Sequence, residues 1–293
     1  WQDYLQMSIS RIDIDAAPRT GPAPVRDGAL SFFSGGVDGS YTALINRDRI
    51  GALVLLRGID MQLTNEELWA DALVSGQRLA SHWRMPFAAV ATNVRFLGYH
   101  YGFKWRRHFQ GAGLASVAHL IPFREALIAA SYALEDSPPL GSHPALDPLW
   151  SSSTVRVVHD GAVRRTDKLR ALVEEPAVLE VLRVCWHDSG YNCCRCEKCI
   201  RTMVALRLLG APTPTFPERL DLSRLVTLRT DQGGHYPYVL ELDDLEREFQ
   251  DPELRQALDK VIAQERRRAG WRRFDAATGG VLSRLKRMLR RKG

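Results

Sequence analysis

Long apolar stretches are missing from this 293-residue sequence. No uninterrupted run of about 18 apolar residues occurs, and no basic-then-apolar leader opens the chain. We therefore expect no transmembrane segment and a soluble, cytoplasmic protein. Cysteine is also scarce, with five residues that all fall between positions 185 and 199. Scattered pairs would have suggested disulfides, whereas an odd, clustered set favours a metal site in a reducing compartment.

Acidic residues are almost absent from the C-terminal end, which makes the charge distribution uneven. Residues 266–293 contain eleven Arg and Lys residues and one Asp, a local balance of +10, so the rest of the chain is at −4 within a total of +6. If residues 1–265 were strongly basic, they would suggest an enzyme that acts on nucleic acid. Because this part of the chain is nearly neutral, its charge does not require a nucleic-acid partner. The tail itself suits nucleic-acid phosphates, a protein partner, an anionic membrane surface or a solvated segment.

Strand and helix patterns alternate from Ala29 onward, which predicts a parallel sheet covered on both faces by helices. Helical patterns begin near Gly39, Glu66 and Gly111, and Asn65 is placed to cap the second. The predicted fold class is therefore α/β, with a doubly wound, mostly parallel, Rossmann-like sheet and a helical C-terminal extension. Five strands are expected at Leu30–Phe33, Ala52–Leu56, Phe87–Ala91, Ala126–Ala130 and Val155–Val158.

A glycine turn joins the first predicted strand to the first helix. It reads Ser34-Gly35-Gly36-Val37-Asp38-Gly39-Ser40. Such a turn aims backbone N–H groups and the helix dipole at one point, so it predicts an anion site, to which Ser34 and Ser40 add hydroxyl donors. The carboxylate of Asp38 beside a phosphate cradle makes sense if Mg²⁺ lies between them. No Lys follows the glycines, which excludes a Walker A loop.

These residues resemble the Ser-Gly-Gly-x-Asp-Ser signature of the PP-loop ATP pyrophosphatases. The resemblance implies that the loop holds the β- and γ-phosphates of ATP, while a nucleophile attacks the α-phosphate to give an adenylated intermediate and pyrophosphate. Gly39 is the one departure, because it stands where a Ser is usual, and the adjacent Ser40 is the candidate substitute. A plain structural turn and a degenerate loop that binds nucleotide without catalysis are the alternatives.

The cysteines form a Cys-x7-Cys-x2-Cys-x2-Cys framework when Cys194 is left out. Four thiolates at such spacing suit a tetrahedral zinc ion with no open coordination position, so the role would be structural. A disulfide and an iron–sulfur cluster are the alternatives. Spacing alone leaves both Cys193 and Cys194 open as the second ligand.

A phosphate loop followed later by a four-cysteine site is similar to the 7-cyano-7-deazaguanine synthases (QueC), a PP-loop family. In that family a Gly follows the second cysteine ligand. Cys194 takes the place of this Gly, so the resemblance implies that its neighbour binds the metal. The implied zinc ligands are Cys185, Cys193, Cys196 and Cys199.

Polar residues near the carboxyl edge of the predicted sheet are candidates for contacts with ATP. The PP-loop resemblance implies that adenosine lies along the carboxyl ends of the first strands, where Asp60 and Thr92 follow the second and third strands. Lys168 opens a predicted helix and is placed to meet phosphate or to stabilise charge at the α-phosphorus. Ordinary turn roles for Asp60 and Thr92, and a surface role for Lys168, stay open.

The segment between the fourth and fifth strands is a candidate acceptor site. His143 offers proton transfer, Asp147 hydrogen bonding and Trp150 stacking on a flat ring. The alternative is structural, with His143 capping a turn and Trp150 filling the core.

The chain is expected to divide into five parts. The first residue is Trp1, so we expect a cut start. The parts are an N-terminal segment (1–28), an ATP-binding domain (29–184), a zinc knot with its helix (185–210), a helical extension (211–265) and the basic tail (266–293). Within the last two, 242–267 is read as a charged helix or pair of helices, and Val281–Arg291 as a further helix.

Together these patterns predict an ATP-dependent adenylating ligase with ATP, Mg²⁺ and Zn²⁺ as cofactors. It would adenylate a carboxylate or amide oxygen of a small-molecule or nucleobase-like acceptor, after which an amine or ammonia displaces AMP. The catalytic candidates are Asp38, Ser40 and Lys168. The alternatives are a PP-loop enzyme that modifies tRNA bases and a nucleotide-binding module that has lost catalysis and works through a partner. A homodimer is compatible with either.

Overall fold

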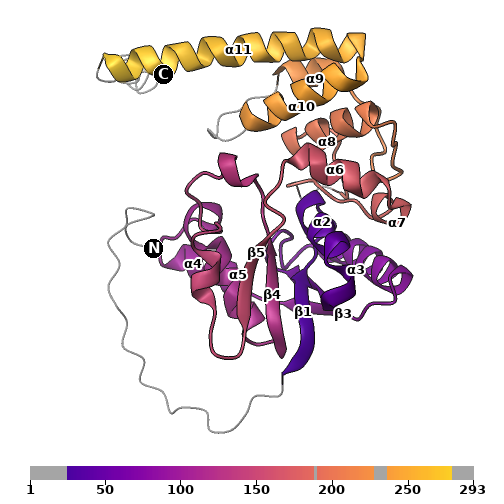
Figure 1. Ribbon diagram of the computed structural model, residues 1–293, viewed down its shortest axis with the longest axis vertical. Helices are drawn as coiled ribbons and strands as arrows, with labels where there is room; N and C mark the ends of the chain where they lie inside the picture. Colours follow the sequence, from indigo (N-terminus) through magenta and orange to yellow (C-terminus); the bar gives the residue numbers. More distant parts are fainter. Residues whose placement is uncertain (1–24, 188–189, 228–235, 279–293) are drawn as a thin grey trace. The chain divides into compact units, whose positions relative to one another are not determined.

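The computed structural model describes residues 25–187, 190–227 and 236–278 (Figure 1). The chain divides into two compact units, Trp1–Arg219 and Leu220–Gly293. The expected helix Val281–Arg291 and most of the segment 1–28 lie outside the described residues. Within the described part, no helix combines the length and the apolar character that crossing a membrane requires.

The first unit is built on a parallel sheet. In the described residues its five strands lie in the order β3-β2-β1-β4-β5, and every neighbouring pair is parallel. The order runs outward from β1 in both directions, so the sheet is doubly wound and β1 is its central strand. This confirms the predicted fold class, and each predicted strand overlaps an observed one. The strands are β1 (Arg26–Phe32), β2 (Ile50–Arg57), β3 (Phe87–Ala91), β4 (Phe123–Ala129) and β5 (Arg156–Asp160).

Helices connect the strands and cover both faces of the sheet (Figure 1). They are α2 (Val37–Ile45), α3 (Glu66–His82), α4 (Val94–His100), a π-helix (Trp105–Phe109) and α5 (Gln110–Ala118), with 3-10 helices at Arg47–Arg49, Leu134–Asp136 and Asp147–Trp150. After β5 follow α6 (Arg165–Val173), α7 (Pro176–Leu179) and α8 (Glu197–Leu208). Alternate strand residues face opposite sides. Val54 packs into a cluster with α5 and the π-helix, whereas Leu55 packs against α3. Asn65 caps α3 as expected, because its Oδ1 accepts a hydrogen bond from the N–H of Leu68 at 3.0 Å.

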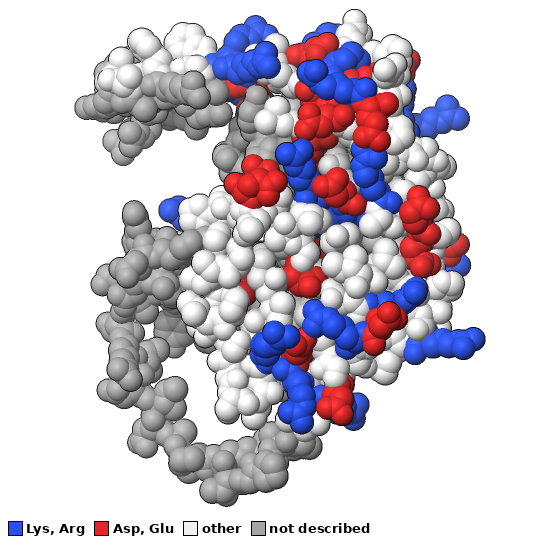
Figure 2. Space-filling model, viewed as in Figure 1, with Lys and Arg blue, Asp and Glu red and all other residues white. Residues whose placement is uncertain are grey.

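The second unit is helical, as predicted. Its described helices are α9 (Leu222–Thr227), α10 (Tyr236–Phe249) and α11 (Pro252–Ala277). Leu245 and Leu258 are buried in it. Arg255 of α11 forms ion pairs with Asp243 and Glu246 of α10, at 2.6 and 2.7 Å. Figure 2 shows the same interleaving over this unit, where Lys and Arg side chains lie beside Asp and Glu side chains.

Candidate functional site

The glycine-rich loop follows β1 at its carboxyl end and leads directly into α2. Gly36 is the N-cap of α2, and no described side chain caps this end. The first N–H groups of the helix therefore stay available to an anion. Gly35 has a φ of 77°, and a Cβ at this position would lie 2.9 Å from the carbonyl oxygen of Val181. Only glycine fits both conditions without strain.

Asp38, in the first turn of α2, is held by two cations of α6. Its Oδ1 accepts a hydrogen bond from Lys168 Nζ at 2.9 Å, and its Oδ2 accepts one from Arg165 at 3.1 Å. Lys168 is buried and also donates to the carbonyl oxygen of Ala130, just after β4, at 2.5 Å. Burial raises the pKa of Asp38, but the charges of Lys168 and Arg165 outweigh it and lower the pKa from 3.8 to about 2. The fold thus brings the predicted Lys168 to the loop.

Asp38 has two cationic partners that the sequence analysis did not assign to it. Its two carboxylate oxygens accept hydrogen bonds from Lys168 and Arg165, and Mg²⁺ binding beside this carboxylate stays a prediction. Two positive charges against one carboxylate leave an excess of positive charge beside the glycine loop. This excess suits an anionic ligand such as a phosphate.

The small residues of the loop have different environments. Ser34 is partly exposed, whereas Ser40 is fully buried and its hydroxyl has no hydrogen-bond partner among the described residues. A Cβ at Gly39 would lie 3.1 Å from the carbonyl oxygen of Phe32. Gly39 therefore lets α2 pack closely against the end of β1. The idea that Ser40 substitutes for the usual Ser stays a prediction.

Asp60 and Thr92 lie where β2 and β3 end. The backbone carbonyl of Thr92 approaches Gly58 so closely that a Cβ there would lie 1.9 Å away, and Gly58 has a φ of 94°. The hydroxyl of Thr92 accepts a hydrogen bond from the N–H of Val94 at 3.2 Å, at the start of α4. Asp60 is exposed, and its charge acts on Lys198 of α8. Contacts of Asp60 and Thr92 with adenosine stay a prediction.

Lys198 is a residue whose position sequence reasoning missed. From the sequence, Lys198 is expected only to offset the negative charge of the neighbouring thiolates of Cys196 and Cys199. In the structure its Nζ lies 4.6 Å from the centroid of the Trp186 ring. Burial lowers the pKa of Lys198, the charge of Asp60 raises it and the charge of Arg165 lowers it. The charges of Asp60 and Asp38 therefore both act on the ammonium group of Lys198.

Arg183 was also missed. Its N–H donates to the carbonyl oxygen of Gly35 at 2.8 Å, so the chain after α7 pairs with the glycine loop. Its side chain is 3% exposed, and its Nε and Nη2 have no hydrogen-bond partner in the described residues. A buried guanidinium without a counter-charge is costly, so it marks a place that an anion would stabilise. The available signal was a single Arg inside the apolar run Val178–Val184.

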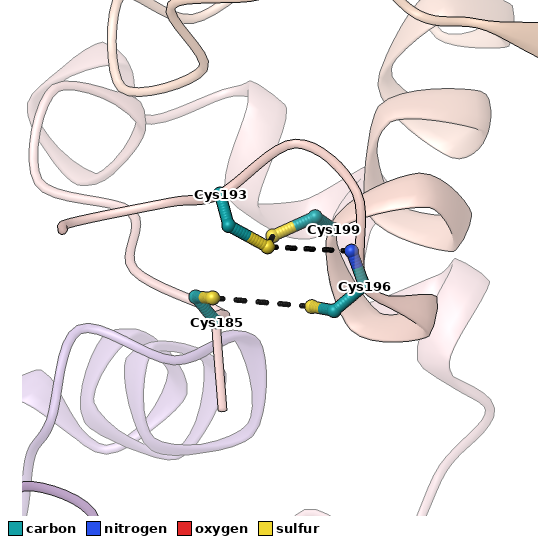
Figure 3. A group of neighbouring side chains, drawn as sticks. All are labelled: Cys185, Cys193, Cys196 and Cys199. Carbon is teal, nitrogen blue, oxygen red and sulfur yellow. Dashed lines mark hydrogen bonds between the residues drawn. The ribbon is translucent and has the colours of Figure 1, made fainter. Parts of the chain in front are cut away.

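Four cysteines converge on one point (Figure 3). All their sulfur atoms lie within 4.8 Å of one another, with Cys185 to Cys196 at 3.9 Å and Cys193 to Cys199 at 4.0 Å. A tetrahedral site with Zn–S bonds of about 2.3 Å has sulfur–sulfur edges of about 3.8 Å, so the arrangement fits zinc. The N–H groups of His187 and Cys196 each donate to a cluster sulfur at 3.3 Å. The cluster can therefore hold a metal ion such as zinc.

Cys194 lies outside this cluster, so the four cysteines that converge are the four that the resemblance implies as ligands. Its φ of 53° turns the side chain away, and its sulfur lies 3.7 Å from the carbonyl oxygen of Asn192. Burial raises the pKa of its thiol. The side-chain oxygen of Asn192 accepts hydrogen bonds from the N–H groups of Val184 and Cys185, at 2.9 and 3.2 Å. The Asn192 side chain therefore links the segment that carries Cys185 to the segment that carries Cys193.

The segment between β4 and β5 forms a closed polar cluster. Asp147 is fully buried, and its Oδ2 accepts a hydrogen bond from Ser142 at 2.8 Å and lies 2.7 Å from His159 Nδ1. His143 Nδ1 accepts a hydrogen bond from a backbone N–H of its own turn at 3.0 Å. Trp150 packs against the core of the sheet. These contacts fit the structural alternative, and acceptor binding by these residues stays a prediction.

Known proteins give no direct guide to this site. Neither the comparison with protein-family models nor the search of curated proteins finds a match to this chain. The function must therefore be argued from the site itself. The site consists of a glycine loop at the carboxyl end of β1, a basic cluster around Asp38 and a four-cysteine cluster whose segment pairs with the loop.

Proposed function

We propose that this chain is an ATP-dependent adenylating enzyme of the PP-loop type, similar to QueC. It would activate a carboxylate or amide oxygen of a small-molecule or nucleobase-like acceptor and release pyrophosphate. The observation that supports this most is the pairing of Asp38 with both Lys168 and Arg165 beside the glycine loop. Ligands of open α/β sheets bind at this carboxyl edge, where the direction of winding reverses.

In this proposal each part of the loop site has one task. The backbone N–H groups at the start of α2 bind phosphate oxygens. Asp38 stays ionised at neutral pH, because its pKa is lowered to about 2, and it orients Lys168 and Arg165. These cations stabilise the negative charge that develops as pyrophosphate leaves. ATP supplies the adenylyl group, and Mg²⁺ adds charge neutralisation when bound.

The cysteine cluster would act structurally. Four sulfur ligands leave no open coordination position for catalysis. The N–H of Arg183, two residues before Cys185, donates to Gly35, so a bound metal would hold this part of the loop wall in place. None of the five cysteines forms a disulfide, which leaves the four of the cluster able to bind a metal.

Product analysis tests the proposal. The full chain would be incubated with ATP and a cell extract, and pyrophosphate release and adenylated products would be followed by mass spectrometry. We expect Lys168→Met to lower pyrophosphate release by about a hundredfold or more, because a preorganised cation at the reacting phosphates is lost. Arg164→Met is the matched control, since Arg164 precedes α6 and its side chain is 47% exposed.

Folding must be checked alongside activity, because Lys168 is buried. Asp38→Asn is therefore measured with it, and both variants are compared with the native chain by thermal unfolding. A folded Lys168→Met variant with the native rate would contradict the proposed role. ATP binding without turnover of any acceptor by the native chain would instead indicate the nucleotide-binding module and sink the enzyme proposal.

A further inference from the structure

A long stretch of the first unit has no negative charge. Residues 72–124 contain seven Arg and Lys residues and no Asp or Glu. Within them, residues 94–109 include six aromatic residues, and this segment forms α4 and the π-helix. The proposed adenylation uses none of these side chains. The combination of positive charge with aromatic rings therefore needs a separate explanation.

The aromatic residues of α4 and the turn after it face solvent. Phe96, Tyr99 and Tyr101 are 58%, 47% and 68% exposed. The guanidinium of Arg95 lies over the Tyr99 ring, 5.5 Å from its centroid. Single exposed aromatic residues are ordinary, but three within six positions form a surface that usually marks a binding site.

Cations follow these rings in the chain, in and next to the π-helix that contacts α4. Lys104 and Arg107 are exposed, and neither has an acidic partner among the described residues. Burial lowers the pKa of His108, and the charges of Arg107 and Lys104 lower it further. The N–H of Lys104 also donates to His108 Nδ1 at 3.3 Å. The π-helix and its flanking residue thus present a cluster of positive charge next to α4.

We propose that the aromatic–basic surface, formed by Phe96, Tyr99, Tyr101, Lys104 and Arg107, binds single-stranded nucleic acid. Unpaired bases expose flat faces that stack on aromatic side chains, and the phosphates of the same strand take up the positive charge. A duplex keeps its base faces inside. An acidic peptide would neutralise the cations but would offer the three rings no flat partners.

The surface lies next to the carboxyl edge of the sheet. α4 begins directly after Thr92, and Arg95 donates a hydrogen bond to the carbonyl oxygen of Ile59, the neighbour of Asp60. A bound strand would therefore pass close to the edge at which the phosphate loop lies. The inference does not depend on adenylation, because it rests on none of the loop residues.

Fluorescence anisotropy with labelled oligonucleotides tests this binding. The full chain is titrated with single-stranded RNA and DNA of about 20 nucleotides at several salt concentrations. We expect the double variant Phe96→Ala, Tyr101→Ala to bind about tenfold or more weakly, because two stacking platforms are lost. Replacing Lys104 and Arg107 by Ala should reduce the slope of log K against log salt by about 1.4, since two phosphate contacts disappear.

Matched controls distinguish binding at this surface from non-specific binding and from binding by the basic tail. Val74→Ala removes an exposed apolar residue of α3, and Arg124→Ala removes a cation that pairs with Asp27, so both should bind as the native chain does. A third variant replaces Arg290, Arg291 and Lys292 by Ala. Binding lost only in this tail variant would overturn the proposal. So would equal affinity for a duplex of the same length, or no binding at all.

Discussion

Two carboxylates of the first unit, Asp38 and Asp147, have opposite environments. The side chain of Asp38 is 24% exposed, pairs with two cations from another helix and lies at the glycine loop. Asp147 is fully buried and contacts Ser142 of the same crossover and His159 of β5. Both carboxylates belong to segments that the sequence marks as candidate sites. Excess charge and access to solvent, rather than residue type, distinguish a ligand site from a structural cluster.

The largest expected effect concerns the four-cysteine cluster, whose segment pairs with the glycine loop. Cys193→Ser should abolish zinc binding, whereas Cys194→Ser should leave it intact, because only Cys193 belongs to the cluster. Structural zinc sites contribute about 10 kcal/mol or more of folding free energy in zinc-finger peptides, so the loss should loosen the whole knot. Zinc content and hydrogen–deuterium exchange measure both effects.

Hydrogen–deuterium exchange should show whether the region around Asp38 or the region around Asp147 loses protection when the metal is absent. In the zinc-free variant, protection should fall around Gly35, which accepts a hydrogen bond from Arg183, and stay closer to native around Asp147. Uniform loss of protection would mean that the two regions are not separable. Zinc retained by Cys193→Ser and lost by Cys194→Ser would contradict the ligand set.

The next largest effect is expected from Asp147→Ala. The change leaves the buried Ser142 and His159 contacts without their acceptor, which should lower the free energy of unfolding by about 3 kcal/mol. Urea unfolding measures it, with Asp48→Ala as a control at an exposed position. A loss below about 0.5 kcal/mol would show that the cluster is not structural.

The sheet and the loop were predictable because their signals are local. The apolar run Leu30–Phe33 and the glycines after it specify a strand, a turn and a helix start within a dozen positions. The cysteine spacing is equally local, and the resemblance then selected Cys193 over Cys194; in the structure Cys193 belongs to the cluster and Cys194 does not. Short-range patterns of this kind depend on backbone geometry that few residues determine.

The partners within the site were not predictable in the same way. Lys168 is 130 positions from Asp38, and Arg183 meets Gly35 only after the chain has crossed the sheet. Which cation reaches a carboxylate depends on how the helices pack, and sequence periodicity does not predict this packing. The burial of Asp147 likewise depends on His159 in β5, whose side chain the sequence leaves unplaced.

Acid titration should separate the two carboxylates further. The pKa of Asp38 is lowered from 3.8 to about 2, so its ionised form stabilises the fold above about pH 4, and this contribution is lost as the pH falls toward 2. The shift corresponds to about 2 kcal/mol. Between about pH 5 and pH 2 the native chain should lose that much more unfolding free energy than Asp38→Asn. Parallel curves for the two proteins would argue against the ion pairs.

The smallest effect is expected inside the loop itself, at Gly39→Ser. A Cβ there lies 3.1 Å from the carbonyl oxygen of Phe32, so the strand end must shift slightly, at about 1 kcal/mol. Serine's better helix propensity offsets about half of this, which leaves a net loss of about 0.5 kcal/mol. Gly36→Ala is the control, because its Cβ meets only ordinary contacts at 3.6 and 3.7 Å. A loss of several kcal/mol in urea unfolding would mean that the loop is packed as tightly as the Asp147 cluster, and the contrast between an open and a closed site would fail.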